Sequence, residues 1–384
     1  KIMIPFNKPH LSGNELDYIK DAVNSGKLSG NGKYTKKCQH FFEEKYGFKK
    51  TFLTTSCTDA LEMCALLLDI KPGDEVIIPS YTFVSTALAF VRQGAKIIFA
   101  DSEKNTPNLD VRKIEYLITD KTKVIVPVHY AGVAVDMDPL MDLASKYNLF
   151  VVEDAAQAID SFYKGKPLGT IGHLSTFSFH ETKNIIAGEG GLLGINDERF
   201  VKRAEIIWEK GTNRTSFFRG EVDKYGWVDT GSSFLPSELN AAFLWGQLES
   251  LDKIQQRRKY IWELYFNELA LVVESIGIKL PELPHYATKN GHMFYLICQS
   301  IEQRQALINY LKEKGILAVF HYLSLHKSEF HTRMNKGEKL QLTYSDYYTN
   351  TIVRLPLYYS LENNEIDFIL KSIKEFIRNY KING

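Results

Sequence analysis

A lysine with unusual neighbours lies in the segment SFHETKNIIAGEGG, residues 178–191. Lys183 follows a Ser/Thr/aromatic run that is typical of a strand, and three of the four residues 188–191 are glycine. Glycine lets a backbone turn tightly against another group, at a cost in conformational entropy. A lysine on an ordinary solvated surface needs no such context. The segment therefore predicts an amine with a function.

Hydroxyl and aromatic groups that could bind a ligand occur in two earlier segments. In TTSCTDALEM, the N–H groups and hydroxyls of Ser56, Cys57 and Thr58 would form an anion site at a helix N-terminus. In PSYTFVST, Tyr81 or Phe83 could cover the face of a planar ligand. A simple helix cap in the first segment and hydrophobic packing in the second are the alternatives.

An acidic side chain closes another apolar run, in the segment FVVEDAAQA. Asp154 ends this run, and Gln157 follows three residues later. A carboxylate at the end of a buried strand is costly unless a cation or hydrogen-bond donors meet it. The alternative is that Asp154 caps a following helix.

These groups should converge, because each follows a predicted strand. Between residues 50 and 155, short Val/Ile-rich runs alternate with amphipathic runs, which is typical of a doubly wound, mostly parallel sheet with right-handed crossovers. Ligands of such sheets bind beyond the carboxyl ends of the strands. The expected strands are residues 50–55, 74–79, 95–100, 122–129 and 148–154, and the expected helices are 59–70, 82–93, 111–120 and 138–148.

The second half of the chain is expected to complete this domain and then to form a smaller α+β domain. We place the boundary near residue 250, which gives domains of residues 1–250 and 251–384. The polar and aromatic residues 212–236 show no periodicity and predict a long functional or interface loop. Further strands are expected at 174–179, 190–196, 292–299 and 316–322, and one long helix at 236–269.

A phosphate cradle, a flat aromatic side chain, a buried carboxylate and a lysine are together the groups that pyridoxal 5′-phosphate requires. Its aldehyde needs a covalent anchor, here Lys183, and its pyridine nitrogen needs an anionic partner, here Asp154. A nicotinamide-dependent oxidoreductase would instead need a GxGxxG loop after the first strand. The run GEGGLLG comes too late for that and leads into a strand. A relative that binds the cofactor without turnover remains an alternative.

Composition excludes several other classes of function. The net charge of +1 over 384 residues does not indicate a surface that binds nucleic acid or a membrane. The chain has no apolar run of membrane-spanning length and no signal-like start, and its four cysteines lack metal or disulfide spacing. Its histidines, among them His129 and His173, also lack metal-ligand spacing. We therefore expect a cytoplasmic protein that holds no metal.

Four segments, FVVEDAAQA, SFHETKNIIAGEGG, PSYTFVST and VPVHYAG, together resemble the sugar-nucleotide aminotransferases of fold type I, in the aspartate-aminotransferase superfamily. The resemblance extends over essentially the whole chain. It implies a large domain with a mostly parallel mixed sheet, a smaller C-terminal α+β domain, and a homodimer with active sites at its interface. It also implies pyridoxal 5′-phosphate as cofactor, with pyridoxamine 5′-phosphate as its aminated form.

The resemblance assigns roles to individual residues. Lys183 is the expected catalytic residue, which anchors the aldehyde and carries a proton. The family often has glycine where this chain has Cys57, and many members have an asparagine, supplied by the partner subunit, where this chain has Ser233. The expected cofactor-binding residues are Ser56, Cys57, Thr58, Phe83, Asp154, Gln157, Ser178, Lys183 and Ser233. The expected substrate-binding residues are His180, Asn213, Arg214, Arg219, Lys224, His321, Tyr322 and His326.

The implied reaction transfers an amino group from L-glutamate to a dTDP-4-keto-6-deoxyhexose. Its product would be dTDP-4-amino-4,6-dideoxygalactose, a precursor of a surface glycan such as O-antigen lipopolysaccharide. A 3-aminotransferase acting on a dTDP-3-keto-6-deoxyhexose would use the same residues and remains open. A pyridoxamine-dependent sugar dehydratase is disfavoured, because those proteins have histidine where this chain has Lys183.

Overall fold

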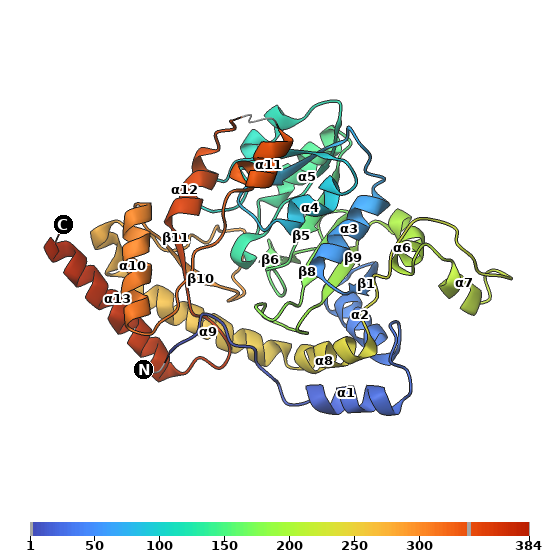
Figure 1. Ribbon diagram of the computed structural model, residues 1–384, viewed down its shortest axis with the longest axis horizontal. Helices are drawn as coiled ribbons and strands as arrows, with labels where there is room; N and C mark the ends of the chain where they lie inside the picture. Colours follow the sequence, from blue (N-terminus) through green and yellow to red (C-terminus); the bar gives the residue numbers. More distant parts are fainter. Residues whose placement is uncertain (1–2, 336–338, 384) are drawn as a thin grey trace.

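A seven-stranded sheet forms the centre of the chain (Figure 1). The computed structural model describes residues 3–335 and 339–383. The strand order is β1-β9-β8-β5-β4-β2-β3; β9 runs antiparallel to β1 and β8, and the other neighbours are parallel. The mostly parallel mixed sheet is therefore confirmed. Its strands are β1 (Lys50–Thr54), β2 (Glu75–Pro79), β3 (Lys96–Ala100), β4 (Thr122–Ile125), β5 (Phe150–Asp154), β8 (Leu174–Ser178) and β9 (Gly191–Ile195).

Helices cover both faces of this sheet, which explains why its strands are apolar without a break. Along β2, Ile77 packs in the core on one face, whereas Val76 and Ile78 pack in the core on the other. In β5, Val151 packs in the core on the first face and Val152 in the core on the second. The helices of this part are α1 (Glu15–Asn24), α2 (Lys33–Tyr46), α3 (Cys57–Leu67), α4 (Ser85–Val91), α5 (Met137–Lys146), α6 (Val201–Trp208), α7 (Arg214–Phe218) and α8 (Glu238–Glu249).

A second, smaller sheet carries the C-terminal part of the chain. Its two antiparallel strands are β10 (Phe294–Ile297) and β11 (Ile352–Leu355). These strands share a separate hydrophobic core with the surrounding helices, and Ile4 of the N-terminal segment also packs in this core. A domain division near residue 250 remains a prediction. The remaining elements are β6 (Phe162–Tyr163), β7 (Lys166–Pro167), α9 (Leu251–Ala270), α10 (Ile301–Glu313), α11 (Glu329–Met334), α12 (Thr343–Thr351) and α13 (Asn363–Asn383).

Two helix predictions were wrong. Residues 111–120 form two short 3₁₀ turns, Val111–Lys113 and Glu115–Leu117, and Ile118 is already extended. The Asp110 carboxylate accepts a hydrogen bond from the Arg112 N–H and closes the first turn. The long helix expected at 236–269 is two helices, α8 and α9, which meet at Ser250.

The strand expected at 316–322 does not form a continuous ladder. Ile316 bridges to Ile4, whereas Val319 bridges to Arg354 of β11. Since the segment changes partner within three residues, it is extended but belongs to no sheet. Beyond Val319, His321 still contacts Arg354 of β11, whereas Tyr322 reaches Gln157, which follows β5 of the large sheet.

No helix among residues 3–335 and 339–383 is long and apolar enough to cross a membrane.

A buried carboxylate fixes the connection between β7 and β8. Glu153 of β5 is fully buried and accepts hydrogen bonds from the N–H groups of Gly169, Ile171 and Gly172 at 2.7–2.8 Å. Its fourth contact is His129 Nε2, at 2.9 Å. These contacts hold β8, and so the segment that carries Lys183, beside β5.

We predict that Glu153→Gln lowers the free energy of unfolding by roughly 2–4 kcal/mol. The amide presents N–H groups to buried N–H donors and leaves them without an acceptor. Urea denaturation measures the change. The exposed Glu274→Gln is the control and should leave stability within about 0.5 kcal/mol of wild type. Equal stability of both variants would contradict the structural role of Glu153.

Candidate active site

Four neighbouring strands bring the predicted residues to one edge of the sheet. Asp154 of β5 pairs with Thr176 of β8, and Ser178 of β8 pairs with Gly191 of β9. Gly191 in turn pairs with Thr54, at the end of β1. Because β9 is antiparallel, its first residue lies at the edge where its neighbours end. The carboxylate, the lysine segment and the N-terminus of α3 therefore meet at this edge.

The Asp154 carboxylate is buried and held from two sides. The Thr86 hydroxyl donates to its Oδ2 at 2.8 Å, and the Ala156 N–H donates to its Oδ1 at 3.1 Å. Burial raises the pKa of Asp154, whereas these two hydrogen bonds and the nearby Lys183 amine oppose that rise. The site thus contains an acid whose charge depends on donors around it.

The Lys183 amine is buried close to Cys57, Arg354 and Asp154. Burial lowers the pKa of Lys183 from its ordinary 10.5 to about 8, and the positive charge of Arg354 adds to the effect. A lysine with such a pKa has an appreciable fraction of free amine near neutral pH. That is the form that attacks an aldehyde.

The N-terminus of α3 forms a cradle for an anion. Ser56 caps the helix, with its Oγ accepting from the Asp59 N–H at 3.0 Å, and the Thr58 hydroxyl lies 2.7 Å from the Ser85 hydroxyl. The helix dipole and the free N–H groups of the first turn favour negative charge here. A Cβ atom on Gly191 would collide with the backbone of Ser56 and Cys57. This close approach explains the glycine at the start of β9.

Aromatic rings and an amide border the other side of the site. The Phe83 side chain is 56% exposed, and its ring centroid lies 6.2 Å from that of Tyr322. Gln157 donates from its Nε2 to the Tyr322 hydroxyl at 2.8 Å and accepts from the Ala131 N–H at 2.6 Å. Phe83 is thus open to a stacking ligand, and Gln157 is fixed by two hydrogen bonds.

These groups fit pyridoxal phosphate on the evidence of their own chemistry. An anion cradle, an exposed ring, a buried carboxylate and a buried amine of lowered pKa lie together at one edge of the sheet. The buried cations need an anionic ligand, and the cradle is kept open by a glycine. Among the residues that the structure describes, no group of three or more His, Cys, Asp or Glu could hold a metal ion.

Two residues of this region were missed from the sequence. Thr86 lies within a helix of small and apolar residues, where a threonine carries no distinctive signal. Arg354 lies on β11, 171 positions after Lys183, and only the fold brings them together. A buried arginine in an apolar strand could have been flagged by its high cost of burial.

The predicted substrate residues of the 212–236 loop do not join Lys183 within one chain. The loop extends from the body of the molecule around α7 (Figure 1). Asn213 accepts from the Gly226 N–H at 2.8 Å, and Arg219 pairs with Glu205 and Glu221. These contacts support the loop itself. Asn213, Arg214, Arg219 and Lys224 remain predicted substrate residues.

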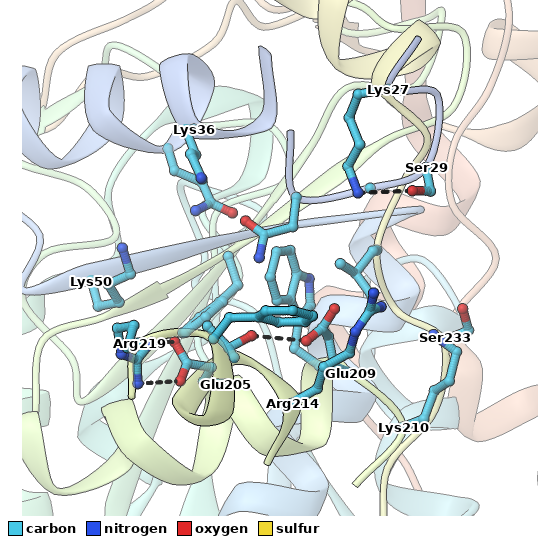
Figure 2. Close-up of a pocket in the computed structure, with 18 residues that line it drawn as sticks. Lys27, Ser29, Lys36, Lys50, Glu205, Glu209, Lys210, Arg214, Arg219 and Ser233 are labelled. Atoms are coloured by element: carbon cyan, nitrogen blue, oxygen red, sulfur yellow. Dashed lines mark hydrogen bonds and ion pairs between the residues drawn. The ribbon is translucent and has the colours of Figure 1, made fainter. Parts of the chain in front are cut away.

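Arg214, Arg219 and Ser233 instead line a separate pocket of about 720 Å³ beside β1 (Figure 2). Six cationic side chains and two acidic ones border it, so it favours an anion. The expected phosphate contact of Ser233 is not made in the cradle of its own chain and remains a prediction. The charged lining residues are Lys27, Lys36, Lys50, Lys210, Arg214, Arg219, Glu205 and Glu209.

The predicted histidines have different surroundings. His321 lies in the site region, where Arg354 Nη1 donates to its Nδ1 at 2.6 Å. The ring of His180 lies 2.9 Å from the Thr182 hydroxyl, and its backbone carbonyl accepts from the Lys183 N–H at 2.9 Å. His326 is buried, with its Nδ1 2.7 Å from the Ser80 hydroxyl. The contacts of His180 and His326 are structural, and their predicted roles in substrate binding stay untested.

We predict that Thr86→Val weakens binding of pyridoxal phosphate by about 10- to 100-fold, the effect of losing a hydrogen bond to a charged group. The valine removes a donor that favours the ionised form of Asp154. Fluorescence titration of cofactor-free protein measures the dissociation constant. Thr86→Ser keeps the hydroxyl and should stay close to wild type. Equal affinities of the valine and serine variants would contradict this role.

We also predict that cofactor-free protein captures pyridoxal phosphate with a rate that rises with pH and levels off above a midpoint of about 8. Only the unprotonated Lys183 amine reacts, and its fraction increases as pH rises through this pKa. Stopped-flow absorbance measures the rate. The urea-unfolded chain is the control, with a midpoint near the ordinary 10.5. A folded protein with that same high midpoint would contradict the prediction.

Comparison with known proteins agrees with this geometry. The family model of the DegT/DnrJ/EryC1/StrS aminotransferases matches residues 9–374. GDP-perosamine synthase of Escherichia coli O157:H7 is 32% identical over 381 residues, which cover 97% of this chain and 98% of that protein. The spore coat polysaccharide biosynthesis protein SpsC of Bacillus subtilis (strain 168) is 29% identical, covering 98% of this chain and 97% of SpsC.

Solved structures show the same fold. Spr1654 from Streptococcus pneumoniae in its PMP form superposes with a TM-score of 0.90 at 26% identity, covering 98% of this chain and 99% of that one. A PLP form of the same protein is also known. DesV from S. venezuelae superposes with a TM-score of 0.89 at 26% identity, with the same coverage. The fold is that of the fold type I aminotransferases, and pyridoxal phosphate is the cofactor. The chain belongs to the DegT/DnrJ/EryC1/StrS aminotransferase family of sugar aminotransferases.

Proposed function

We propose that this sugar aminotransferase moves an amino group from L-glutamate to the 4-keto carbon of a dTDP-4-keto-6-deoxyhexose. The product would be dTDP-4-amino-4,6-dideoxygalactose, which makes the protein a dTDP-4-amino-4,6-dideoxygalactose transaminase of surface glycan synthesis. The observation that carries the reaction class is the buried Lys183 amine of lowered pKa beside the buried Asp154 carboxylate. The choice of sugar rests on the sequence resemblance. A cytoplasmic location remains a prediction.

Each residue at the edge of the sheet would have a separate role in the reaction. When bound, pyridoxal phosphate supplies an aldehyde that takes up the amino group and a ring that accepts electrons. Lys183 would hold the aldehyde covalently and then carry a proton to and from the substrate carbon. Asp154 would stabilise positive charge on the ring nitrogen from a low-dielectric surrounding. Phe83 would cover the ring face, and the cradle at Ser56–Thr58 would hold the phosphate.

Positioning of the reacting groups would also contribute. Gln157 and Tyr322 form a hydrogen-bonded pair at the border of the site, in which Gln157 Nε2 donates to the Tyr322 hydroxyl at 2.8 Å. Such fixed groups hold a ketone beside an amine without a further loss of freedom during the reaction. The face of the sugar presented to Lys183 would set the configuration of the new amine.

We predict that the protein with pyridoxal phosphate and L-glutamate converts dTDP-4-keto-6-deoxyglucose to the 4-amino galacto sugar. NMR of the product gives both the position and the configuration of the amine. The control is Lys183→Ala, which should form no amino sugar. A 3-amino product from the 3-keto sugar, or turnover of GDP-linked keto sugars alone, would contradict the proposed substrate. The GDP-linked test is included because one relative is a GDP-perosamine synthase.

A two-fold homodimer is the second part of the proposal. The projecting 212–236 loop exposes large apolar side chains, with Trp227 86% and Phe218 69% exposed. An apolar group of this kind favours burial against a partner. Arg214, Arg219 and Ser233 of the same loop line the cationic pocket beside β1 (Figure 2). In the proposed dimer, the loop of each subunit lies over the active site of the other and contributes to binding the nucleotide-sugar.

We predict that the wild-type protein has twice the 44.0 kDa mass of one chain in light scattering. Trp227→Asp should weaken the dimer at least tenfold, because it places a charge in an apolar contact. Tyr116→Asp is the matched control, since Tyr116 is 88% exposed on another part of the surface. An active wild-type monomer, or equal loss in both variants, would contradict the proposed interface.

A further inference from the structure

A buried asparagine directly follows the predicted catalytic lysine and binds a distant part of the chain. Asn184 is 5% exposed and lies between β8 and β9. Its Nδ2 donates to Gln255 Oε1 of α9 at 2.7 Å and to the Asn290 carbonyl at 2.9 Å. Its Oδ1 lies 2.9 Å from Nδ1 of His292, which precedes β10. A buried amide whose hydrogen bonds are all made holds its own backbone in place.

The direction of the contact between Asn184 and His292 follows from the other two. The Asn184 amide uses both of its N–H groups on carbonyl oxygens, so its Oδ1 can only accept. His292 Nδ1 therefore carries a proton and donates it to this hydrogen bond. Burial, with the nearby charge of Lys183, holds the pKa of His292 well below its ordinary value. Since the neutral imidazole keeps the proton on Nδ1, the contact persists over the pH range in which a lysine titrates.

Asn290 connects the same cluster to the other side of the candidate active site. Its Nδ2 donates to the carbonyls of Gln157 and Ile159 at 2.8 and 2.9 Å, and its Oδ1 accepts from the His292 N–H at 3.0 Å. A Cβ atom on Gly132, whose φ is +77°, would collide with the Asn290 amide. The turn at Gly132 thus has space for this side chain only because the residue is glycine. One cluster therefore fixes the lysine segment and the Gln157 segment relative to each other.

We propose that Asn184 is a positioning residue, which fixes the Lys183 segment, and with it the reactive amine, through its contacts with the C-terminal part of the chain. The inference rests on the proposed role of Lys183. The two residues are consecutive, so the three hydrogen bonds of one side chain restrict the backbone from which the other side chain extends. Asn184 needs no contact with cofactor or substrate for this effect.

The place of the amine decides its charge. Burial lowers the pKa of Lys183 to about 8. The titratable groups that lie close to the amine are Cys57 of α3, Asp154 of β5, Arg354 of β11, and the two histidines His292 and His321. If Asn184 loses its contacts, the segment can move and water can reach the amine, which favours its charged form. The pKa of Lys183 would then rise toward its ordinary 10.5.

The pH dependence of cofactor capture tests the inference. Cofactor-free protein is mixed with pyridoxal phosphate over a range of pH, and stopped-flow absorbance gives the rate. Asn184→Ala should raise the midpoint from about 8 by about one pH unit, because the amine is better solvated. The rate near neutral pH should accordingly fall by about tenfold, since the fraction of free amine falls by that factor.

Asn196→Ala is the matched control. Asn196 also donates from its Nδ2 to two backbone carbonyls, those of Gly169 and Gly172, both at 2.8 Å. It follows the last residue of β9, whereas the candidate active site lies at the first residue of that strand. This variant should lose stability in urea denaturation but keep its midpoint near 8. A loss of stability alone would thus leave the capture profile unchanged.

Two substitutions of His292 provide a second comparison, which does not require Asn184→Ala to fold. His292→Asn places an N–H donor near the position of Nδ1, whereas His292→Leu has no donor. Since His292 is neutral, neither change removes a charge beside Lys183. The asparagine variant should keep the midpoint of wild type, and the leucine variant should raise it as Asn184→Ala does.

The possible outcomes separate this inference from the role of Lys183. A midpoint near 8 in both Asn184→Ala and His292→Leu would overturn the inference, and so would an equal upward shift in Asn196→Ala. Lys183→Ala should capture no cofactor by this route. Capture that continues in Lys183→Ala would overturn the proposed role of Lys183, and the inference with it.

Discussion

Burial of the Lys183 amine beside the Asp154 carboxylate is the constraint on which the rest of the site depends. Both groups have reduced contact with water, so the charge of each depends on its neighbours. Burial moves the pKa of the lysine down and that of the aspartate up, and hydrogen bonds from Thr86 and Ala156 oppose the second shift. The protein thus holds an amine of lowered pKa and a hydrogen-bonded carboxylate close together. That is the combination that a pyridoxal phosphate enzyme requires.

The fold produces this combination by the order of its strands. Strands β1, β8 and β5 end at the same edge of the sheet, and antiparallel β9 begins there. The first residue of β9 is Gly191, because a Cβ atom there would collide with the backbone of Ser56 and Cys57. The two-stranded sheet of the C-terminal part then adds Arg354, and the segment that leaves it adds His321 and Tyr322. Groups from distant parts of the sequence therefore surround one amine. The residues predicted to bind the cofactor lie at the edge of the large sheet.

The sequence predicted the large sheet and the position of Asp154 and Lys183 at one edge of it, because both depend on local patterns. Val/Ile runs marked most of the strands; Asp154 ends one of them, and the Lys183 segment follows the Ser/Thr/aromatic run at 174–179. It did not reveal Thr86 or Arg354, whose importance comes from contacts 68 and 33 positions away along the chain. The strand expected at 316–322 was wrong because tertiary contacts divide its pairing between Ile4 and Arg354. The helix expected at 236–269 was wrong because the backbone of Ser250, with φ −103° and ψ 9°, is not helical, and no glycine or proline marks this break in the sequence.

Covalent attachment of the cofactor to Lys183 is the most direct test of this account. The protein with bound pyridoxal phosphate is reduced with borohydride, digested and analysed by mass spectrometry to locate the pyridoxyl group. We expect the group on the peptide that contains Lys183, at about one per chain. We also expect the site to be lost in Lys183→Ala. A pyridoxyl group fixed mainly on another lysine would contradict the assignment of the active site.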